Sequence, residues 1–402
     1  MIAPKYNECE ICYHFDDDEG GVYECLVCHR IFCDKHRDIH QQETNHSDFK
    51  QHLKTLDPNI KEDIIDNSPS SMVSGFQNLG NTCYFNSNLH VLFAIDEFVN
   101  YCLTDECDNR VIPSEDKIEH QLGHQLHRFL VALHKGDRLF MRPSLLREAI
   151  DVDSPEYLNP RPQDSIDFFN YMITTIKKKL GFPETHLNLT EFDFVDTITC
   201  SNCSKTFTSL NTRKNNQASD PFYCFIIKPR QHPDECDEPV QLNLDEMIDD
   251  RCNYAFKNIS ETDLKGFKRL NWTCPNCQCH EGTIARKIKN APKYLFINNR
   301  LDHGSREKDT RKKLKANLEF DINNLDISRH VLEGNGKYEL IAFMHHMGRW
   351  AKWGHDISYV RKSGSDNIFY KFNDLVVKEV DVRTNVEFGK QYLYLFKQKS
   401  VL

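Results

Sequence analysis

The sequence predicts an α+β protein in which a small metal-binding domain precedes one large domain. Apolar residues recur at helical spacing over 83–100 and again over 163–179. After residue 290 the pattern changes to short apolar runs typical of strands, at Tyr294 to Ile297, Tyr338 to Met344, Ile357 to Val360 and Tyr392 to Phe396. Helices first and antiparallel strands later indicate the α+β class.

Length and charge limit the classes of function that are possible. The 402 residues leave room for two or three domains, and the formal net charge of -9 argues against a nucleic-acid partner. The first residues lack the pattern of a signal peptide, and no apolar run approaches the roughly 20 residues that a membrane span needs. We therefore expect an intracellular protein with no membrane partner, located in the cytoplasm, the nucleus or both.

Composition shifts divide the chain into three parts. Residues 1–56 hold cysteines and histidines but too few apolar residues for a core, so we expect a zinc-finger domain that needs metal to fold. Residues 57–74 carry Asn67-Ser68-Pro69-Ser70-Ser71 and read as a linker. Residues 75–402 form one large domain with a cysteine-rich insertion near 195–290.

Cysteine spacing predicts three structural zinc ions and no organic cofactor. Eight of the 16 cysteines form CxxC pairs, which in a reducing compartment indicate metal sites more often than redox or disulfide chemistry. Eight N-terminal ligands suit two tetrahedral ions, and we expect the crossed arrangement. Its sets are Cys9, Cys12, Cys33 and His36 for one ion, and Cys25, Cys28, His40 and His46 for the other. A third set is Cys200, Cys203, Cys274 and Cys277, with Cys279 as a competing ligand.

The candidate nucleophile is Cys83. It follows a loop containing Gly80 and begins a helical pattern, where unpaired N–H groups and the helix dipole favour the thiolate. Asn78, five residues earlier, is placed to donate its amide to an oxyanion. On these grounds alone a lone cysteine at a helix start is more often a small buried residue.

The whole string from Gly75 to Ser87 resembles the cysteine box of ubiquitin-specific proteases, G-x-x-N-x-G-N-T-C-Y-x-N-S, and matches every fixed position. Its continuation over 91–98 is similar to the isopeptidase T branch, which acts on free polyubiquitin. The resemblance implies a papain-like cysteine protease fold of fingers, palm and thumb. In that fold a helix bearing the cysteine faces a sheet bearing a histidine and an aspartate.

The resemblance also implies a base. Tyr338 to Gly348 resembles the family's Y-x-L-x-A-x-x-x-H-x-G, and Gly354-His355 matches the motif whose histidine is the general base. Asp374 aligns with the residue that orients the imidazole, and Asn373 is a possible substitute. The chain departs from the pattern at Asp356, where the family has Tyr; that carboxylate either interacts with the base or points to solvent.

Asp164 is the candidate substrate-binding residue. The segment Arg161 to Phe169 resembles Q-Q-D-x-x-E-F, in which acidic residues pair with arginines in the ubiquitin tail. Pro162 and Asp167 replace two family residues. The alternative role, a carboxylate capping a helix start, is compatible with the first.

The zinc regions resemble family modules as well. Tyr23 to Cys28 is similar to the W-x-C-L-x-C of the ubiquitin-binding zinc finger, but Tyr23 replaces Trp and Lys35 replaces the Arg that grips the ubiquitin carboxylate. The third set matches the zinc ribbon in the family's fingers, a metal that isopeptidase T tends to lack. The short segment from Ile327 to Tyr338 leaves no room for that branch's two ubiquitin-associated domains.

The expected function is a deubiquitinating cysteine protease that hydrolyses the isopeptide bond after the C-terminal glycine of ubiquitin, with polyubiquitin disassembly as one form of it. Two alternatives are a non-catalytic zinc scaffold that binds ubiquitin and a protease for a ubiquitin-like modifier. The joint presence of Cys83, His355 and Asp374 argues against the scaffold. Expected partners are ubiquitin or polyubiquitin and a protein docked on the N-terminal zinc finger.

Overall fold

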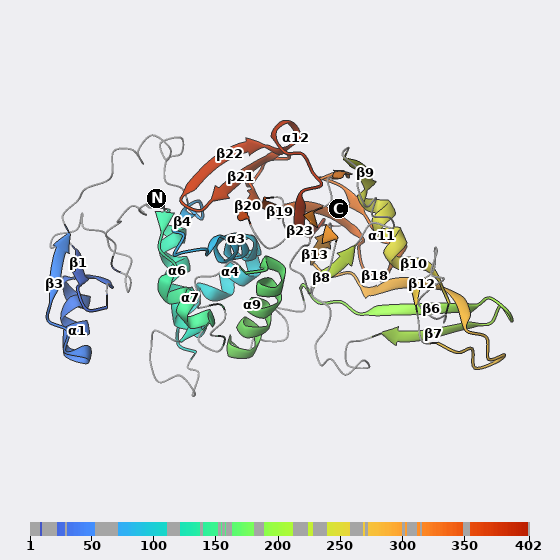
Figure 1. Cartoon of the computed structure of the whole chain (residues 1–402), viewed down its shortest axis with the longest axis horizontal. Coiled ribbons are helices and arrows are strands. Elements are labelled where there is room, and N and C mark those ends of the chain that lie inside the picture. Colours follow the sequence, from blue (N-terminus) through green and yellow to red (C-terminus); the bar gives the residue numbers. More distant parts are fainter. Residues whose placement is uncertain are drawn as a thin grey trace. The chain divides into compact units, whose positions relative to one another are not determined.

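The chain folds into two compact units in a computed structural model (Figure 1). Unit 1 comprises Met1–Phe182, Asp356–Tyr359 and Phe369–Val380, and unit 2 comprises Pro183–His355, Val360–Ile368 and Asp381–Leu402. The described residues are 9, 22–28, 30–52, 71–110, 121–136, 140–151, 154, 157, 163–180, 189–211, 224–227, 239–257, 268–269, 272–299, 302–303, 312–313, 316–348 and 354–400.

Within unit 1, residues 22–52 form a small module, called here the N-terminal module. Strand β1 (Val22–Cys25) lies between β2 (Ile31–Cys33) and β3 (Phe49–His52), both antiparallel to it, and helix α1 (Asp34–Thr44) follows β2. His40 is buried and stacks on Phe32 with ring centroids 4.4 Å apart. Because the module has so few buried apolar side chains, we expect its stability to depend on metal binding by its cysteines and histidines.

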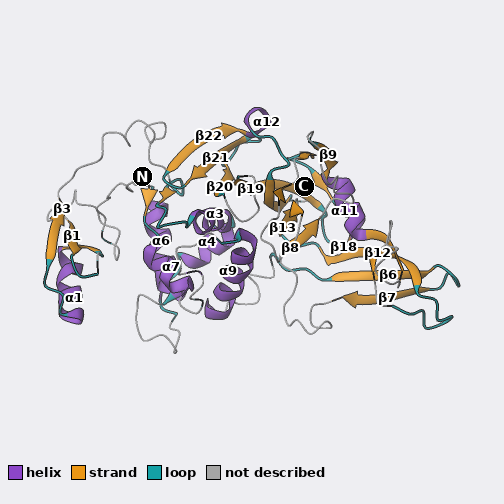
Figure 2. Ribbon diagram, viewed as in Figure 1, coloured by secondary structure: helices purple, strands orange, loops and turns teal. Residues whose placement is uncertain are grey.

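The larger part of unit 1 is helical (Figure 2). The stretch 83–100, predicted as one helix, is two. A tight turn ends the first helix, because the N–H groups of Ala94 and Ile95 bond to the carbonyls three residues back. Asp96 and Glu97 then favour a new helix start. None of the described helices is long and apolar enough to cross a membrane. The helices are α3 (Cys83–Leu92), α4 (Asp96–Cys102), α5 (Asp105–Asp108), α6 (Leu122–Lys135), α7 (Ser144–Asp151) and α9 (Ser165–Leu180).

Unit 1 also contains two short strands and segments of three strands from the C-terminal part of the chain. Strands β20 (His355–Arg361), β21 (Ile368–Asn373) and β22 (Val376–Asp381) are neighbours in the order β22-β21-β20. Strand β4 (Gly75–Phe76) pairs with β5 (Phe140–Met141), and the N–H of Phe76 bonds to the carbonyl of Asp374. A Cβ on Gly75 would lie 2.3 Å from the carbonyl oxygen of Leu375, so only glycine permits this close approach.

Unit 2 contains a sheet in which β23 (Gln391–Gln398) pairs antiparallel with β19 (Lys337–Met347) and β13 (Tyr294–Asn299). Parallel to β13 lies β8 (Cys224–Ile227). The central residues Leu393 to Phe396 are all buried, which confirms that both faces of this strand are covered. The strands predicted near 294, 338, 357 and 392 are all present.

A second sheet in unit 2 contains the cysteine-rich insertion. Strand β6 (Phe194–Cys200) pairs with β7 (Thr206–Asn211) and with β12 (Glu281–Asn290), as seen at the right of Figure 1, and β12 pairs with β10 (Asn253–Lys257). Strand β12 alternates buried and exposed residues, so one face of the sheet has its own core. The CxxC turns lie at one end of this sheet, after β6 and before β12. The remaining elements are β9 (Val240–Asn243), α11 (Leu244–Cys252), β11 (Lys268–Arg269), β14 (Asp302–His303), β15 (Lys312–Lys313), β16 (Ala316–Glu319), β17 (Leu325–Asp326), a 3-10 turn (Ser328–His330), β18 (Val331–Glu333) and α12 (Val382–Asn385).

Candidate active site and metal centres

Cys83 is the first residue of α3, as the sequence predicts, and the loop before it is braced by Asn78. The Oδ1 atom of Asn78 accepts hydrogen bonds from the N–H of Gly80 at 3.0 Å and of Thr82 at 3.1 Å. Gly80 and Asn81 both have positive φ values, of 102° and 53°, which glycine and asparagine tolerate best. The side chains of this loop therefore fix the backbone that presents the thiol.

The environment of Cys83 does not favour the thiolate in the unliganded chain. Burial raises the pKa of the thiol to about 12, with the negative charges of Asp356 and Asp374 acting in the same direction. Backbone N–H groups of Asp356 and Tyr84 lower the pKa but do not compensate. The N–H group at the helix start favours the thiolate, as expected, but burial and the two carboxylates outweigh it.

Asp374 lies against the nucleophile segment. Its Oδ1 accepts a hydrogen bond from Nδ2 of Asn86 at 2.8 Å, and its Oδ2 accepts one from Nδ2 of Asn78 at 3.0 Å. Asn86 also donates to the carbonyl of Phe76 at 3.1 Å. The turn after β21 is thus fastened to both ends of the cysteine box, and Asn78 has one amide hydrogen committed to Asp374.

Asp356 does not point to solvent. Its side chain is buried, and its Oδ2 accepts a hydrogen bond from the hydroxyl of Ser165 at 2.6 Å. Ser165 is the first residue of α9, and its carbonyl accepts a hydrogen bond from Nδ2 of Asn88 on α3. Of the two alternatives left by the sequence, the structure therefore favours an internal role for this carboxylate.

His355 begins β20 and is joined by a peptide bond to Asp356. It belongs to unit 2, where Gly354 precedes it. A Cβ on Gly354 would lie 2.0 Å from the carbonyl oxygen of Met347 and 2.5 Å from the ring of His346. The glycine before the candidate base is therefore a steric requirement, and His346 has a packing role at this point of the chain.

Asp164 caps helix α9. Its Oδ1 accepts hydrogen bonds from the N–H of Ile166 at 3.0 Å and of Asp167 at 3.3 Å. This is the helix-start role that the sequence offered as the alternative. The cap uses Oδ1 of Asp164. Binding of substrate by the same carboxylate stays a prediction.

Two groups of ligand atoms occur in the N-terminal part of unit 1. They combine Cys25, Cys28, His40 and His46 in one group and Cys9, Cys33 and His36 in the other, with ligand atoms within 4.8 Å of one another. Cys12, the fourth expected ligand of the second group, lies outside the described residues. The contact Cys25 Sγ to His46 Nδ1 is 3.5 Å, close to the edge of a tetrahedron around zinc, which is about 3.5 Å for sulfur and nitrogen. The donors follow the crossed arrangement and fit zinc.

A third group lies in the fingers of unit 2. Cys200, Cys203, Cys274 and Cys277 approach within 4.8 Å, and the Cys200–Cys277 and Cys203–Cys274 sulfur distances are both 3.6 Å. Four thiolates suit a closed structural zinc site with no open position. Cys279 is outside the group; its thiol lies 3.8 Å from the carbonyl oxygen of Glu281.

The N-terminal module contains a stack between Tyr23 and Arg37. The guanidinium carbon of Arg37 lies 4.2 Å from the centre of the Tyr23 ring, and the same group pairs with Asp34 and Asp38, each at 2.9 Å. Tyr23 stands where the zinc-finger motif that this segment resembles has a tryptophan. Its ring is therefore covered by an arginine whose charge is already balanced by two carboxylates.

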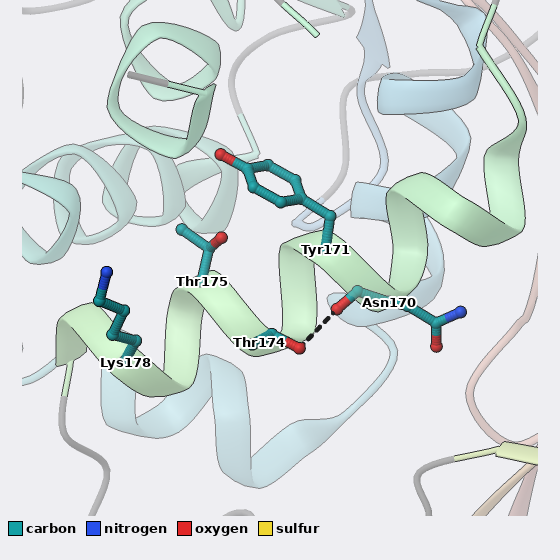
Figure 3. A pocket seen from close by; sticks show the side chains of 5 residues that line it. All are labelled: Asn170, Tyr171, Thr174, Thr175 and Lys178. Carbon is teal, nitrogen blue, oxygen red and sulfur yellow. Dashed lines mark hydrogen bonds between the residues drawn. The ribbon is translucent and has the colours of Figure 1, made fainter. Parts of the chain in front are cut away.

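A shallow pocket of about 400 Å³ lies on α9, apart from the residues above (Figure 3). All five lining side chains come from this helix: Asn170, Tyr171, Thr174, Thr175 and Lys178. The hydroxyl of Thr174 bonds to the carbonyl of Asn170, and that of Tyr171 bonds to the carbonyl of Ile150. The pocket contains none of the predicted site residues.

Sequence reasoning missed Asn86 and Ser165 as parts of the site. Asn86 is a fixed position of the cysteine box, so the signal was present, but its bond to Asp374 depends on the fold. Ser165 carried no signal, because its partner Asp356 lies 191 residues away.

Comparison with known proteins shows the family of the chain. The family described as "Ubiquitin carboxyl-terminal hydrolase" matches residues 74–396. Ubiquitin carboxyl-terminal hydrolase 48 of Rattus norvegicus is 23% identical over 336 residues, which cover 80% of this chain and 29% of that protein. Ubiquitin carboxyl-terminal hydrolase 12 of Saccharomyces cerevisiae is 30% identical over 131 residues, which cover 31% and 10%. The chain spans less than a third of the length of these relatives.

Solved structures show the same fold. The SAGA Ubp8/Sgf11/Sus1/Sgf73 DUB module bound to ubiquitin aldehyde contains a chain that matches with a TM-score of 0.63 at 18% identity, covering 98% of this chain and 90% of that one. The same module bound to monoubiquitin matches with a TM-score of 0.64. Fold and cysteine box define a hydrolase of the ubiquitin-specific protease type. The chain belongs to the ubiquitin carboxyl-terminal hydrolase family.

Proposed function

We propose that this protein is a thiol-dependent deubiquitinase that hydrolyses the isopeptide bond after the last glycine of ubiquitin. The observation that carries the proposal is the fastening of the complete cysteine box, through Asn78 and Asn86, to Asp374. A box kept only for packing would need neither amide on that carboxylate. The ubiquitin-bound complexes among the structural neighbours support the choice of substrate.

In the proposed reaction Cys83 gives its proton to His355, and the sulfur attacks the carbonyl carbon of the ubiquitin C-terminal glycine. The negative charge that forms on the carbonyl oxygen takes a hydrogen bond from Asn78, whose Nδ2 is oriented by its other bond to Asp374. The C–N bond breaks and the leaving lysine amine takes the proton from His355. Water then hydrolyses the thioester, with His355 again acting as base, and regenerates the thiol.

Orientation of the His355 imidazole is assigned to Asp374 with Asn373 as the alternative. Both Asp374 oxygens accept a bond from the cysteine box, so this residue also positions the nucleophile segment. A carboxylate accepts more than two hydrogen bonds, so the two tasks are compatible. Asp164 is proposed to bind an arginine of the ubiquitin tail while it caps α9.

The zinc ions are proposed to be structural. Two would be held by ligands from residues 1–56 and one by the four cysteines of the fingers, and no reaction step involves them. The exposed side chains of Leu26 and Val27, between Cys25 and Cys28, support a role of the module in docking a protein partner. Disassembly of free polyubiquitin is the second form of the activity, and the similarity of residues 91–98 to isopeptidase T favours it.

The decisive experiment is reaction with ubiquitin that carries an electrophilic C-terminus, followed by mass spectrometry. We expect one adduct, on Cys83, and none in Cys83→Ala. His355→Ala should abolish turnover of a ubiquitin substrate while binding persists. An adduct on another of the 16 cysteines, or no adduct with folded protein, would contradict the proposal and favour the scaffold alternative. Parallel probes made from ubiquitin-like modifiers decide the choice of modifier.

A further inference from the structure

The family pattern places Tyr after the base, but this chain has Asp356, and the structure gives this carboxylate a defined place. Asp356 is 4% exposed and Ser165 is 7% exposed, and the 2.6 Å hydrogen bond joins Oγ of the serine to Oδ2 of the aspartate. Burying a carboxylate is unfavourable unless polar groups receive it. The hydroxyl of Ser165 is such a group, so the pair is a built feature of the interior.

The pair is fixed relative to the nucleophile from two directions. The carbonyl of Ser165 accepts a hydrogen bond from Asn88, one and a half turns after Cys83 on α3, at 3.1 Å. The backbone N–H of Asp356 lies near enough to the sulfur of Cys83 to lower the pKa of its thiol. One residue therefore supplies both an N–H group and a negative charge near the sulfur.

The charges around the sulfur favour the neutral thiol. Asp356 contributes from β20 and Asp374 from the turn after β21, and after burial the charge of Asp356 is the strongest influence that raises the pKa of Cys83. From α9 the facing group is the hydroxyl of Ser165, and from α3 it is the N–H of Tyr84. His355 precedes Asp356 in the chain and is the proposed acceptor of the thiol proton.

We propose that Asp356, held by Ser165, is a positioning residue that aligns the sulfur of Cys83 and keeps it protonated in the unliganded enzyme. The proposal rests on the proposed function in treating Cys83 as the nucleophile. Its consequence is a resting enzyme whose thiol resists alkylation and peroxide, because both reactions need the thiolate. The proton then leaves only in the step that transfers it to His355.

The test measures the rate at which iodoacetamide alkylates Cys83 in the zinc-loaded full chain between pH 7 and 9, by quantitative mass spectrometry of the peptide that contains it. Asp356→Asn removes the charge but keeps the shape and the backbone N–H. If the pKa of the Cys83 thiol falls by one unit, about tenfold more thiolate is present, and each thiolate is about threefold less reactive. Alkylation should therefore rise about threefold or more. Asp105→Asn, an exposed carboxylate of unit 1, is the matched control and should not change the rate.

Ser165→Ala supplies an independent arm. Without the hydroxyl donor the Asp356 carboxylate loses the bond that fixes its position. Its effect on the sulfur should weaken, and alkylation should rise by less than in Asp356→Asn. Asp356→Asn with wild-type zinc content and thermal stability but an unchanged or lower rate would overturn the proposal. If Asp356→Asn does not fold, an unchanged rate in Ser165→Ala overturns it. A wild-type chain that does not react with the ubiquitin probe would contradict the proposed function. The alkylation result would still stand.

Discussion

The side-chain amide of Asn86 donates a hydrogen bond to the carboxylate of Asp374 at 2.8 Å, although 288 residues separate them in the sequence. With the bond from Asn78 at 3.0 Å, this contact makes the turn after β21 a brace for the start of α3. The two bonds require two acceptor oxygens at position 374. Only a carboxylate provides them, because an asparagine there would turn its own NH₂ group toward one of the two amide donors.

Asp374→Asn tests the brace. The new amide would turn its NH₂ group toward Nδ2 of Asn78 or of Asn86, so one bond is lost and the oxyanion donor is misplaced. We expect kcat to fall about 100-fold in a folded enzyme, the scale of losing one oxyanion-hole donor. Kinetics with a fluorogenic ubiquitin substrate and circular dichroism of the variant measure both quantities.

Two companion variants separate the roles of Asp374. Asn373→Ala should leave kcat near the wild-type value if Asp374 orients the imidazole, and lower it severely if Asn373 does. Asn86→Ala should lower the free energy of unfolding by about 1–3 kcal/mol, because it leaves a part-buried carboxylate oxygen and the buried carbonyl of Phe76 without this donor. Wild-type kinetics in Asp374→Asn would show that position 374 does not brace the site.

His90 predicts a loss of stability in mild acid. It is buried on α3 between the rings of Phe76 and Phe372, whose centroids lie 3.9 and 3.8 Å from its own, and burial lowers its pKa to about 3. Below the unfolded-state pKa of about 6.5 the unfolded chain takes up a proton that the folded chain refuses, so stability falls as pH falls toward 3. From pH 7 to pH 5 the loss is about 2 kcal/mol.

Urea unfolding of wild type and His90→Phe at pH 7 and pH 5 measures this contribution. The variant keeps an aromatic ring between the two phenylalanines but cannot bind a proton, so its loss between the two pH values should be about 2 kcal/mol smaller. Protonation of zinc-binding histidines affects both proteins equally and cancels in the comparison. His134→Gln, an exposed histidine of α6, is the control, and an equal pH response in all three proteins would contradict the prediction.

Zinc content is predicted to be three ions per chain, two before residue 50 and one in the fingers. Elemental analysis should give three for the full chain, one for a chain beginning at residue 72, and two for Cys277→Ser, which removes one of the four finger thiolates. Cys279→Ser should keep three, because its sulfur is outside the group. A folded shorter chain without zinc would overturn the finger site.

The N-terminal module is predicted to bind ubiquitin weakly or not at all. Lys35 offers a point charge where the family has an Arg fork, and loss of a bidentate charged pair costs about 1.5–3 kcal/mol, or about ten- to hundredfold in affinity. Arg37 cannot readily substitute, because it lies over Tyr23 and pairs with Asp34 and Asp38. Titration calorimetry of residues 1–56 with intact ubiquitin, and with ubiquitin lacking Gly-Gly, measures this. Micromolar binding that requires Gly-Gly would restore a tail-reading role.

Much of the site could be predicted from the sequence because its residues are close together in the chain. The cysteine box places Asn78 and Cys83 within one loop and helix start, and each CxxC pair places two sulfurs on one turn, so local geometry fixes them. The strands near 294, 338 and 392 were predicted because a strand buried on both faces needs a continuous apolar run. The break between α3 and α4 was not predicted, because the apolar spacing continues through it while only the turn at Phe93 interrupts it.

The sequence by itself therefore determined the α+β class, the family and the types of ligand and nucleophile, since these depend on residue identity at short spacing. Tertiary structure alone decided the raised pKa of Cys83, the partners of Asp374 and the inward position of Asp356. The physical reason is that a pKa and a buried hydrogen bond depend on which distant groups share a low-dielectric interior. Ser165 and Asp356 are 191 residues apart in the chain and 2.6 Å apart in the fold.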